Sequence, residues 1–156
     1  MIAIDIPGFG TLELTDLVYD YNGTLALDGR LLEGAGARLP RLTGRLRLHV
    51  VTGDTFGTAR VGLKGLPCDV VVLPPDDQAS AKARYVERLG ANRVAAIGNG
   101  RNDRLMLAAC ALGIGVCGGE GAAAEAIAAC DVVAPDIGAA LDLLLETKRL
   151  IASLRS

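Results

Sequence analysis

The chain has 156 residues, of which 51% are hydrophobic and 22% charged, and its formal net charge is −2. This length fits one domain, so residues 1–156 are expected to fold as a single unit around an aliphatic core. The charge gives no basic field for nucleic acid, no apolar run is long enough to cross a bilayer, and no signal peptide is expected at the N-terminus.

Apolar residues alternate along the first 14 positions on both sides of a Pro-Gly-Phe-Gly turn, which predicts a β-hairpin. After it, short apolar runs alternate with segments of helical periodicity. Strands are expected at 17–19, 46–51, 70–73, 94–97, 114–116 and 132–133, and helices at 56–63, 77–89, 105–112, 122–129 and 137–154. This order predicts an α/β fold, a doubly wound (Rossmann-like) parallel sheet with helices on both faces. In such sheets ligands bind beyond the carboxyl ends of the strands.

Two of these strand ends carry residues that suit an anion. The first strand after the hairpin runs into Asp20, and Gly23 lets the chain turn so that backbone N–H groups face an anion. An Asx-type turn closed by the Asn-Gly pair is the alternative. The next strand runs into Thr52-Gly53-Asp54, where a hydroxyl and N–H groups at a helix start suit a phosphate oxygen. A helix cap is the alternative there, although a cap requires only one such residue.

Lys82 stands on the apolar face of its predicted helix, because Val86 and Leu89 follow it four and seven residues later. A lysine on an inward face requires an anionic partner, unless its long stem carries the ammonium out to solvent. After the strand at 94–97 comes the glycine-rich run of residues 98–103, whose oxygen-bearing side chains suit a hard cation such as Mg²⁺. A helix cap at Asn102 or Asp103 is the alternative.

In this order the motifs D-Y-N-G-T at 20–24, T-G-D at 52–54, Lys82 and G-N-G-R-N-D at 98–103 resemble the four motifs of the haloacid dehalogenase-like superfamily. The phosphorylation domain of P-type ATPases, with D-K-T-G-T, T-G-D and G-D-G-x-N-D, is the most similar variant. The resemblance spans the core of the chain. It implies a soluble, P-type-ATPase-like member of the superfamily without a cap domain.

The resemblance also implies residue roles. Asp20 would be the nucleophile that forms an aspartyl-phosphate, and Thr52 and Lys82 would hold the phosphoryl oxygens and offset their charge. Mg²⁺ would be bound by Asp20, the Asn22 backbone carbonyl, and Asn99 or Asp103. The remaining residues of the motifs are expected to contact a small phosphorylated substrate: Gly23, Thr24, Gly53, Asp54 and Asn102.

Two residues depart from the superfamily pattern. Phosphatases of the superfamily carry a second Asp two residues after the nucleophile, where it protonates the leaving group and activates water. This chain has Asn22 there, and a neutral amide cannot do acid–base work, which predicts a loss of roughly 10²- to 10⁴-fold in rate. Asn99 stands where the family has a metal-binding Asp, so weaker metal binding is expected. Asn22 is still named with Asp20, Thr52 and Lys82 as a catalytic residue, because it occupies the position of that second Asp.

The intervals between the motifs leave little room for a cap, so the site is expected to be open. Cap-less relatives often oligomerise to cover the site or act on large substrates, which makes a homo-oligomer one expectation. The four cysteines form no C-x-x-C pair, which predicts thiols buried in a reducing cytoplasm. No basic patch or amphipathic membrane helix indicates a nucleic-acid or membrane partner.

Two other functions compete with a Mg²⁺-dependent phosphatase or phosphotransferase. A degenerate core that binds phosphate or a protein partner without turnover is favoured by Asn22 and Asn99. A response-regulator receiver also uses Asp, Thr and Lys on a doubly wound sheet. Receivers, however, carry an acidic pair after the first strand and the phosphoacceptor after a later one, whereas Asp20 leads the motif series here.

Overall fold

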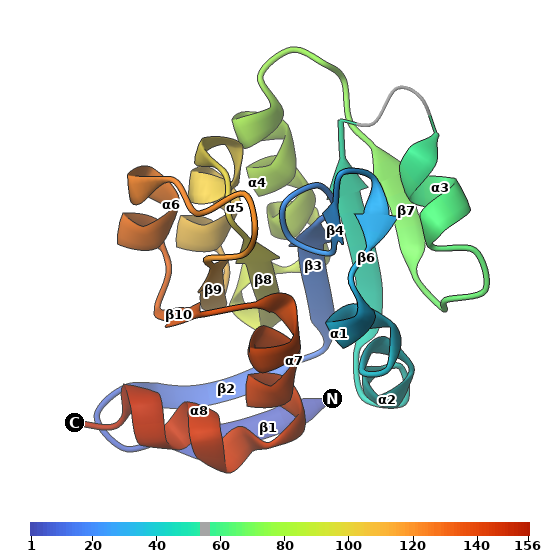
Figure 1. Ribbon diagram of the computed structural model, residues 1–156. Helices are drawn as coiled ribbons and strands as arrows, with labels where there is room; N and C mark the ends of the chain where they lie inside the picture. The colour runs from blue at the N-terminus through green and yellow to red at the C-terminus, as the bar shows by residue number, and fades with distance from the viewer. Residues whose placement is uncertain (54–56) are drawn as a thin grey trace.

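The computed structural model describes residues 1–53 and 57–156. Its centre is a six-stranded sheet in the order β10-β9-β8-β3-β6-β7, in which all neighbouring strands are parallel (Figure 1). The strands are β3 (Asp16–Asp20), β6 (Arg47–Thr52), β7 (Asp69–Val72), β8 (Val94–Gly98), β9 (Leu112–Val116) and β10 (Val132–Ala134). The predicted doubly wound α/β sheet is thereby confirmed.

Side chains alternate between two apolar cores, one on each face of the sheet. Leu17 and Tyr19 of β3 point into one core, and Val18 points into the other. The second core is covered by α4 (Gln78–Leu89), α5 (Arg104–Ala109) and α6 (Ala124–Ala129), and the first by helices that include α1 (Glu33–Gly36), α2 (Leu39–Leu42) and α7 (Ile137–Leu145). A short helix, α3 (Thr58–Gly62), precedes β7. Because both faces are covered, the inner strands are apolar on both sides.

The predicted N-terminal hairpin is present as β1 (Ile2–Ile6) and β2 (Gly10–Leu14), a separate antiparallel pair. The terminal helix predicted at 137–154 is instead two helices, α7 and α8 (Thr147–Leu154), with a break at Glu146. The break lets α8 turn and pack on β1, where Leu150 is fully buried (Figure 1). A single straight helix would pack on the central sheet alone and leave the apolar face of the hairpin exposed.

One further expectation is corrected. The helix predicted at 105–112 ends at Ala109, because the backbone becomes extended at Cys110 and Leu112 begins the buried strand β9. The predicted strand at 70–73 is present as β7, but it is an edge strand and Val72 is 41% exposed. An apolar run alone does not distinguish an edge position from a central one.

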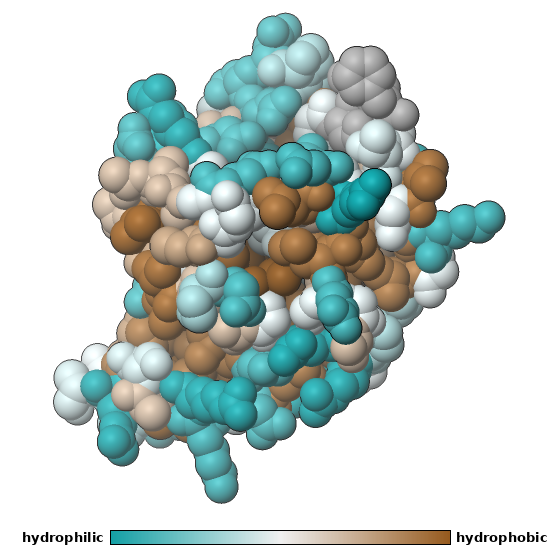
Figure 2. All heavy atoms as spheres, viewed as in Figure 1, coloured by the Kyte–Doolittle hydropathy of each residue, from teal (hydrophilic) through white to brown (hydrophobic). Residues whose placement is uncertain are grey.

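Between the first two motifs the chain forms only small elements. They are the hairpin of β4 (Ala26–Leu27) and β5 (Arg30–Leu31), together with α1 and α2. Leu27, Leu31 and Leu32 line a hollow of about 560 Å³ beside this hairpin. Figure 2, drawn from the same side as Figure 1, shows apolar surface in the middle of the face toward the viewer. Among the described residues, the structure has no helix both long and apolar enough to cross a membrane.

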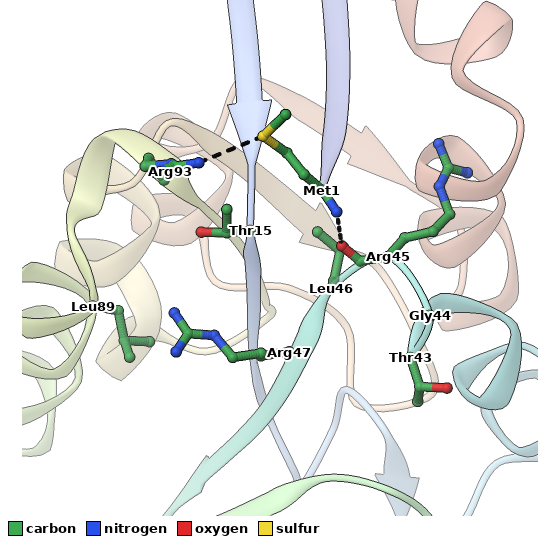
Figure 3. Close-up of a pocket in the computed structure, with 9 residues that line it drawn as sticks. All are labelled: Met1, Thr15, Thr43, Gly44, Arg45, Leu46, Arg47, Leu89 and Arg93. Carbon is green, nitrogen blue, oxygen red and sulfur yellow. Dashed lines mark hydrogen bonds between the residues drawn. The ribbon is translucent and has the colours of Figure 1, made fainter.

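At the amino ends of the strands, Asp16 is fully buried in a polar cluster. Its carboxylate accepts hydrogen bonds from Thr15 Oγ1 at 2.7 Å and from Arg47 Nη2 at 2.9 Å, and it lies 2.9 Å from His49 Nε2. Arg47 also lines a pocket of about 420 Å³ with Arg93, at the end of the sheet opposite the sequence motifs (Figure 3). Burial raises the pKa of Asp16, but the hydrogen bonds from Arg47, Thr15 and His49 outweigh it and hold that pKa below its ordinary value.

We expect Asp16→Asn to lower the free energy of unfolding at pH 7 by about 2 kcal/mol, because it removes charged hydrogen bonds from a buried group. A carboxylate whose folded-state pKa is depressed stabilises the fold above its unfolded pKa, and this stabilisation is lost as the pH falls through the folded-state value. The deficit of the variant should therefore shrink at pH 3. Urea unfolding at the two pH values measures it, and an equal deficit at both would contradict the role of the charge.

Candidate active site

Three neighbouring strands end at one edge of the sheet and bring the sequence motifs together. Asp20 is the last residue of β3, Thr52 the last of β6, and β8 ends at Gly98, immediately before Asn99. Because β3 lies between β6 and β8, the three loops meet in the middle of the sheet. This is the edge at which ligands bind in open α/β sheets.

The best-defined feature of this edge is a buried ion triad. The ammonium of Lys82, on α4, donates to Asp20 Oδ1 and to Asp103 Oδ1, each at 2.7 Å. Lys82 and Asp103 are fully buried, and Asp20 is 8% exposed. The inward position predicted for Lys82 is therefore present, and the alternative that its ammonium reaches solvent is wrong.

The triad carries more negative than positive charge, and the pKa values reflect this. Burial, followed by the charge of Asp103, raises the pKa of Asp20 to about 7, although Lys82 opposes the shift. Burial lowers the pKa of Lys82, but the two carboxylates outweigh it and hold that pKa above its ordinary value. Burial and the neighbouring carboxylate thus disfavour the ionised form of Asp20.

The loop that follows Asp20 is a tight turn around the Tyr21 carbonyl. This carbonyl accepts hydrogen bonds from the backbone N–H groups of Thr24, Leu25 and Ala26, and Gly23 has a φ of +78°, which favours glycine. The Asn22 side chain is exposed at the rim. Thr24, a predicted substrate contact, is fully buried instead, and its hydroxyl donates to Asn99 Oδ1 at 3.3 Å. Thr24 therefore positions Asn99 within the site.

The loop that follows β8 is held by Asp103. Its Oδ2 accepts hydrogen bonds from the backbone N–H groups of Asn99 and Gly100, at 3.0 and 2.8 Å, while its Oδ1 accepts from Lys82. Both carboxylate oxygens of Asp103 thus accept hydrogen bonds from the protein, and its role as a metal ligand stays a prediction. The Asn99 side chain is 6% exposed, and its Nδ2 donates a hydrogen bond to the carbonyl of Gly121 at 3.0 Å.

The loop that follows β6 is described as far as Gly53, and the predicted contact Asp54 lies outside the described residues. Thr52 is buried at the strand end. The carboxamide of Gln78 packs against Gly53, since its Nε2 lies 2.0 Å from the point that a Cβ on Gly53 would occupy. Gln78 Oε1 in turn accepts from Asn102 Nδ2 at 3.2 Å. The structure therefore adds Gln78, which the sequence did not indicate, as the residue that connects two of the loops.

The oxygen donors of this edge fit a hard cation. They are the Asp20 carboxylate, the carbonyl of Asn22 and the carboxamide of Asn99, which are of the kind that Mg²⁺ binds. The described residues contain no group of three or more His, Cys, Asp or Glu side chains placed to hold a metal. All four cysteines are free thiols, but none is fully buried, contrary to expectation: Cys117 is exposed and the other three are partly exposed.

No family model matches the chain. The chain is 46% identical over 79 residues to the uncharacterized protein MJ0073 of Methanocaldococcus jannaschii, over 48% of this chain and 85% of that protein. The name of this relative states no activity. The match therefore shows that the two chains share an ancestor, but it says nothing about the reaction that either performs.

Several solved structures of phosphatases have the same fold. The cobalt-bound deoxy-D-mannose-octulosonate 8-phosphate phosphatase of Haemophilus influenzae gives a TM-score of 0.70 at 17% identity, covering 92% of this chain and 94% of that one. The Moraxella catarrhalis enzyme, in complex with magnesium, phosphate and 3-deoxy-D-manno-octulosonate, gives a TM-score of 0.71 at 17% identity, covering 91% of this chain and 94% of that one. A phosphatase of the haloalkanoate (HAD) superfamily from Bacteroides thetaiotaomicron gives a TM-score of 0.64 at 11% identity, covering 90% of this chain and 96% of that one. The likeness shows a haloacid dehalogenase-like fold.

Proposed function

Because the chain belongs to the same family as protein MJ0073 of Methanocaldococcus jannaschii and has the fold of HAD superfamily phosphatases, we propose that it is a phosphohydrolase or phosphotransferase. The reaction runs through an aspartyl-phosphate on Asp20 and requires Mg²⁺. The observation that carries this proposal is the contact of Lys82 with Asp20 at 2.7 Å at the carboxyl end of the central strand. The subgroup similar to P-type ATPases stays a prediction.

In the first step a carboxylate oxygen of Asp20 forms a bond to phosphorus, while the bond from phosphorus to the leaving oxygen breaks and that oxygen keeps the electron pair. Lys82 holds the nucleophile by Oδ1 alone, so Oδ2 has no side-chain donor among the described residues. The ammonium of Lys82 and the hydroxyl of Thr52 offset charge on the phosphoryl oxygens. When bound, Mg²⁺ would be held by Asp20, the Asn22 carbonyl and Asn99, and would supply further positive charge.

In the second step water attacks phosphorus, the bond to Asp20 breaks and the proton of the water passes to a base. Asn22 stands where such a base would act, and an amide does not accept that proton. The aspartyl-phosphate is therefore long-lived. Transfer of the phosphoryl group to an acceptor that brings its own base is the alternative to rapid hydrolysis.

The substrate class follows from the open site. Small phosphorylated compounds would reach Asp20 without the movement of a cap, and the solved Moraxella catarrhalis phosphatase of the same fold holds phosphate and a sugar acid. The protein is proposed to act in the cytoplasm as a free or self-associated chain.

A second candidate function is a degenerate core that binds phosphate or a protein without turnover. It is favoured by one specific observation, that Asn22 and Asn99 place amides where acidic side chains would do chemistry. The two candidates differ in whether Asp20 accepts a phosphoryl group.

Labelling with radioactive acetyl phosphate and Mg²⁺ tests the proposal. Acetate is a good leaving group that requires no proton, so the missing acid at position 22 does not prevent the first step. We expect label on the natural chain, stable in acid and released by hydroxylamine, as for an acyl phosphate. Asp20→Asn should carry none, and Asp16→Asn, changed at the opposite end of β3, should carry as much as the natural chain. A natural chain that takes no label would favour the binding module.

A further inference from the structure

The loop between β9 and α6, residues 117–123, lies against the two loops that hold the proposed cation site. The backbone N–H of Ala123 donates to the Asn99 carbonyl at 2.8 Å, and Asn99 Nδ2 donates to the Gly121 carbonyl at 3.0 Å. In Figure 1 this loop, in orange, runs beside the blue loop that follows β3. The position of residue 120 is therefore fixed relative to Asn99.

Glu120 projects from this loop toward the site. Its Oε2 lies 2.4 Å from the point that a Cβ on Gly23 would occupy, and Asn99 Nδ2 and Oδ1 lie 2.6 and 2.9 Å from the same point. The carboxylate and the carboxamide thus both lie beside Gly23, the residue that follows Asn22. Glu120 is exposed, and it makes no ion pair or hydrogen bond with another residue that the structure describes.

The charge balance of the site gives this carboxylate a role. Of the two buried carboxylates, Asp103 accepts hydrogen bonds at both oxygens, from Lys82 and from backbone N–H groups, whereas Asp20 accepts a side-chain hydrogen bond at Oδ1 only, among the described residues. One carboxylate and neutral oxygens bind a divalent cation weakly, since affinity rises with the charge of the ligands. Given the cation-dependent function proposed above, we propose that Glu120 supplies the second carboxylate of the cation site formed by Asp20, Asn22 and Asn99.

Titration with Mn²⁺, followed by the electron paramagnetic resonance signal of the free ion and competed with Mg²⁺, tests this assignment, since Mn²⁺ takes the same oxygen ligands. We expect Glu120→Gln to weaken the affinity roughly tenfold or more. Glu13→Gln makes the same change on β2 and should leave the affinity unchanged. In the double variant Glu120→Gln, Asn99→Asp, the new carboxylate should restore most of the affinity.

Thermal unfolding provides a readout that separates a ligand from a structural residue. Without metal, Glu120→Gln should unfold at the same temperature as the natural chain. Mn²⁺ should raise the unfolding temperature of the natural chain more than that of Glu120→Gln, because a ligand stabilises the fold according to its affinity. Equal Mn²⁺ affinities for the natural chain and Glu120→Gln would overturn the assignment of Glu120 alone. If the natural chain binds no Mn²⁺, both the assignment of Glu120 and the cation dependence of the proposed function are overturned. The role of Asp20 is tested separately, by labelling with acetyl phosphate.

Discussion

The phosphoenzyme of Asn22→Asp is expected to release phosphate on the order of 10² times faster than that of the natural chain. Asn22 is exposed at the rim of the site, two residues after Asp20, on a turn whose backbone is fixed by hydrogen bonds to the Tyr21 carbonyl. A carboxylate there accepts the proton of an attacking water, which the amide cannot do. The change adds a base to an otherwise unaltered loop.

The measurement is the release of labelled phosphate from isolated phosphoenzyme at neutral pH. Asn92→Asp is a control of equal charge, because Asn92 lies before β8, at the end of the sheet opposite the site. It should leave the rate within a few-fold of the natural value. Rapid release by the natural chain, with no change in Asn22→Asp, would show that another group is the base and that the role given to position 22 is wrong.

Much of the sheet could be predicted because its strands are marked by local sequence patterns. Runs such as Val94–Ile97 are apolar on both faces, and each is followed by a polar strand-end loop, which together indicate parallel strands. The break at Glu146 could not be predicted, since helical periodicity continues across it. Only the packing of α8 on the hairpin, a contact distant in sequence, decides that the chain bends there.

The site was predictable to a similar degree. Lys82 could be placed beside an anion because its helix face is apolar, and a lysine on such a face requires a counter-charge. The sequence did not show that Asp103 is this partner, because an acidic residue on a glycine-rich loop has the same pattern whether it binds a metal or an ammonium. The sequence did not indicate Gln78, since nothing local distinguishes it from a surface residue.

Replacing Lys82 with methionine is expected to lower the free energy of unfolding at pH 7 by roughly 3–5 kcal/mol. Methionine fills a similar volume, so the main change is electrostatic. Asp20 and Asp103 would lose the ammonium that lies 2.7 Å from each of them. Both carboxylates would remain shielded from solvent, since Asp103 is fully buried and Asp20 is 8% exposed. Uncompensated charges in such a place are among the largest single sources of instability.

Urea unfolding of three further variants assigns this loss to the charge. Arg84→Met removes a cation from the exposed side of the same helix and should change stability by less than about 0.5 kcal/mol. Adding Asp103→Asn to Lys82→Met should recover part of the loss, because it removes one of the two unpaired carboxylates, whereas Asp103→Asn alone should destabilise the natural chain. The deficit of Lys82→Met should also shrink at low pH, as the remaining carboxylates take up protons. If the two changes instead added without coupling, Lys82 and Asp103 would stabilise the fold independently and the buried triad would not act as a unit.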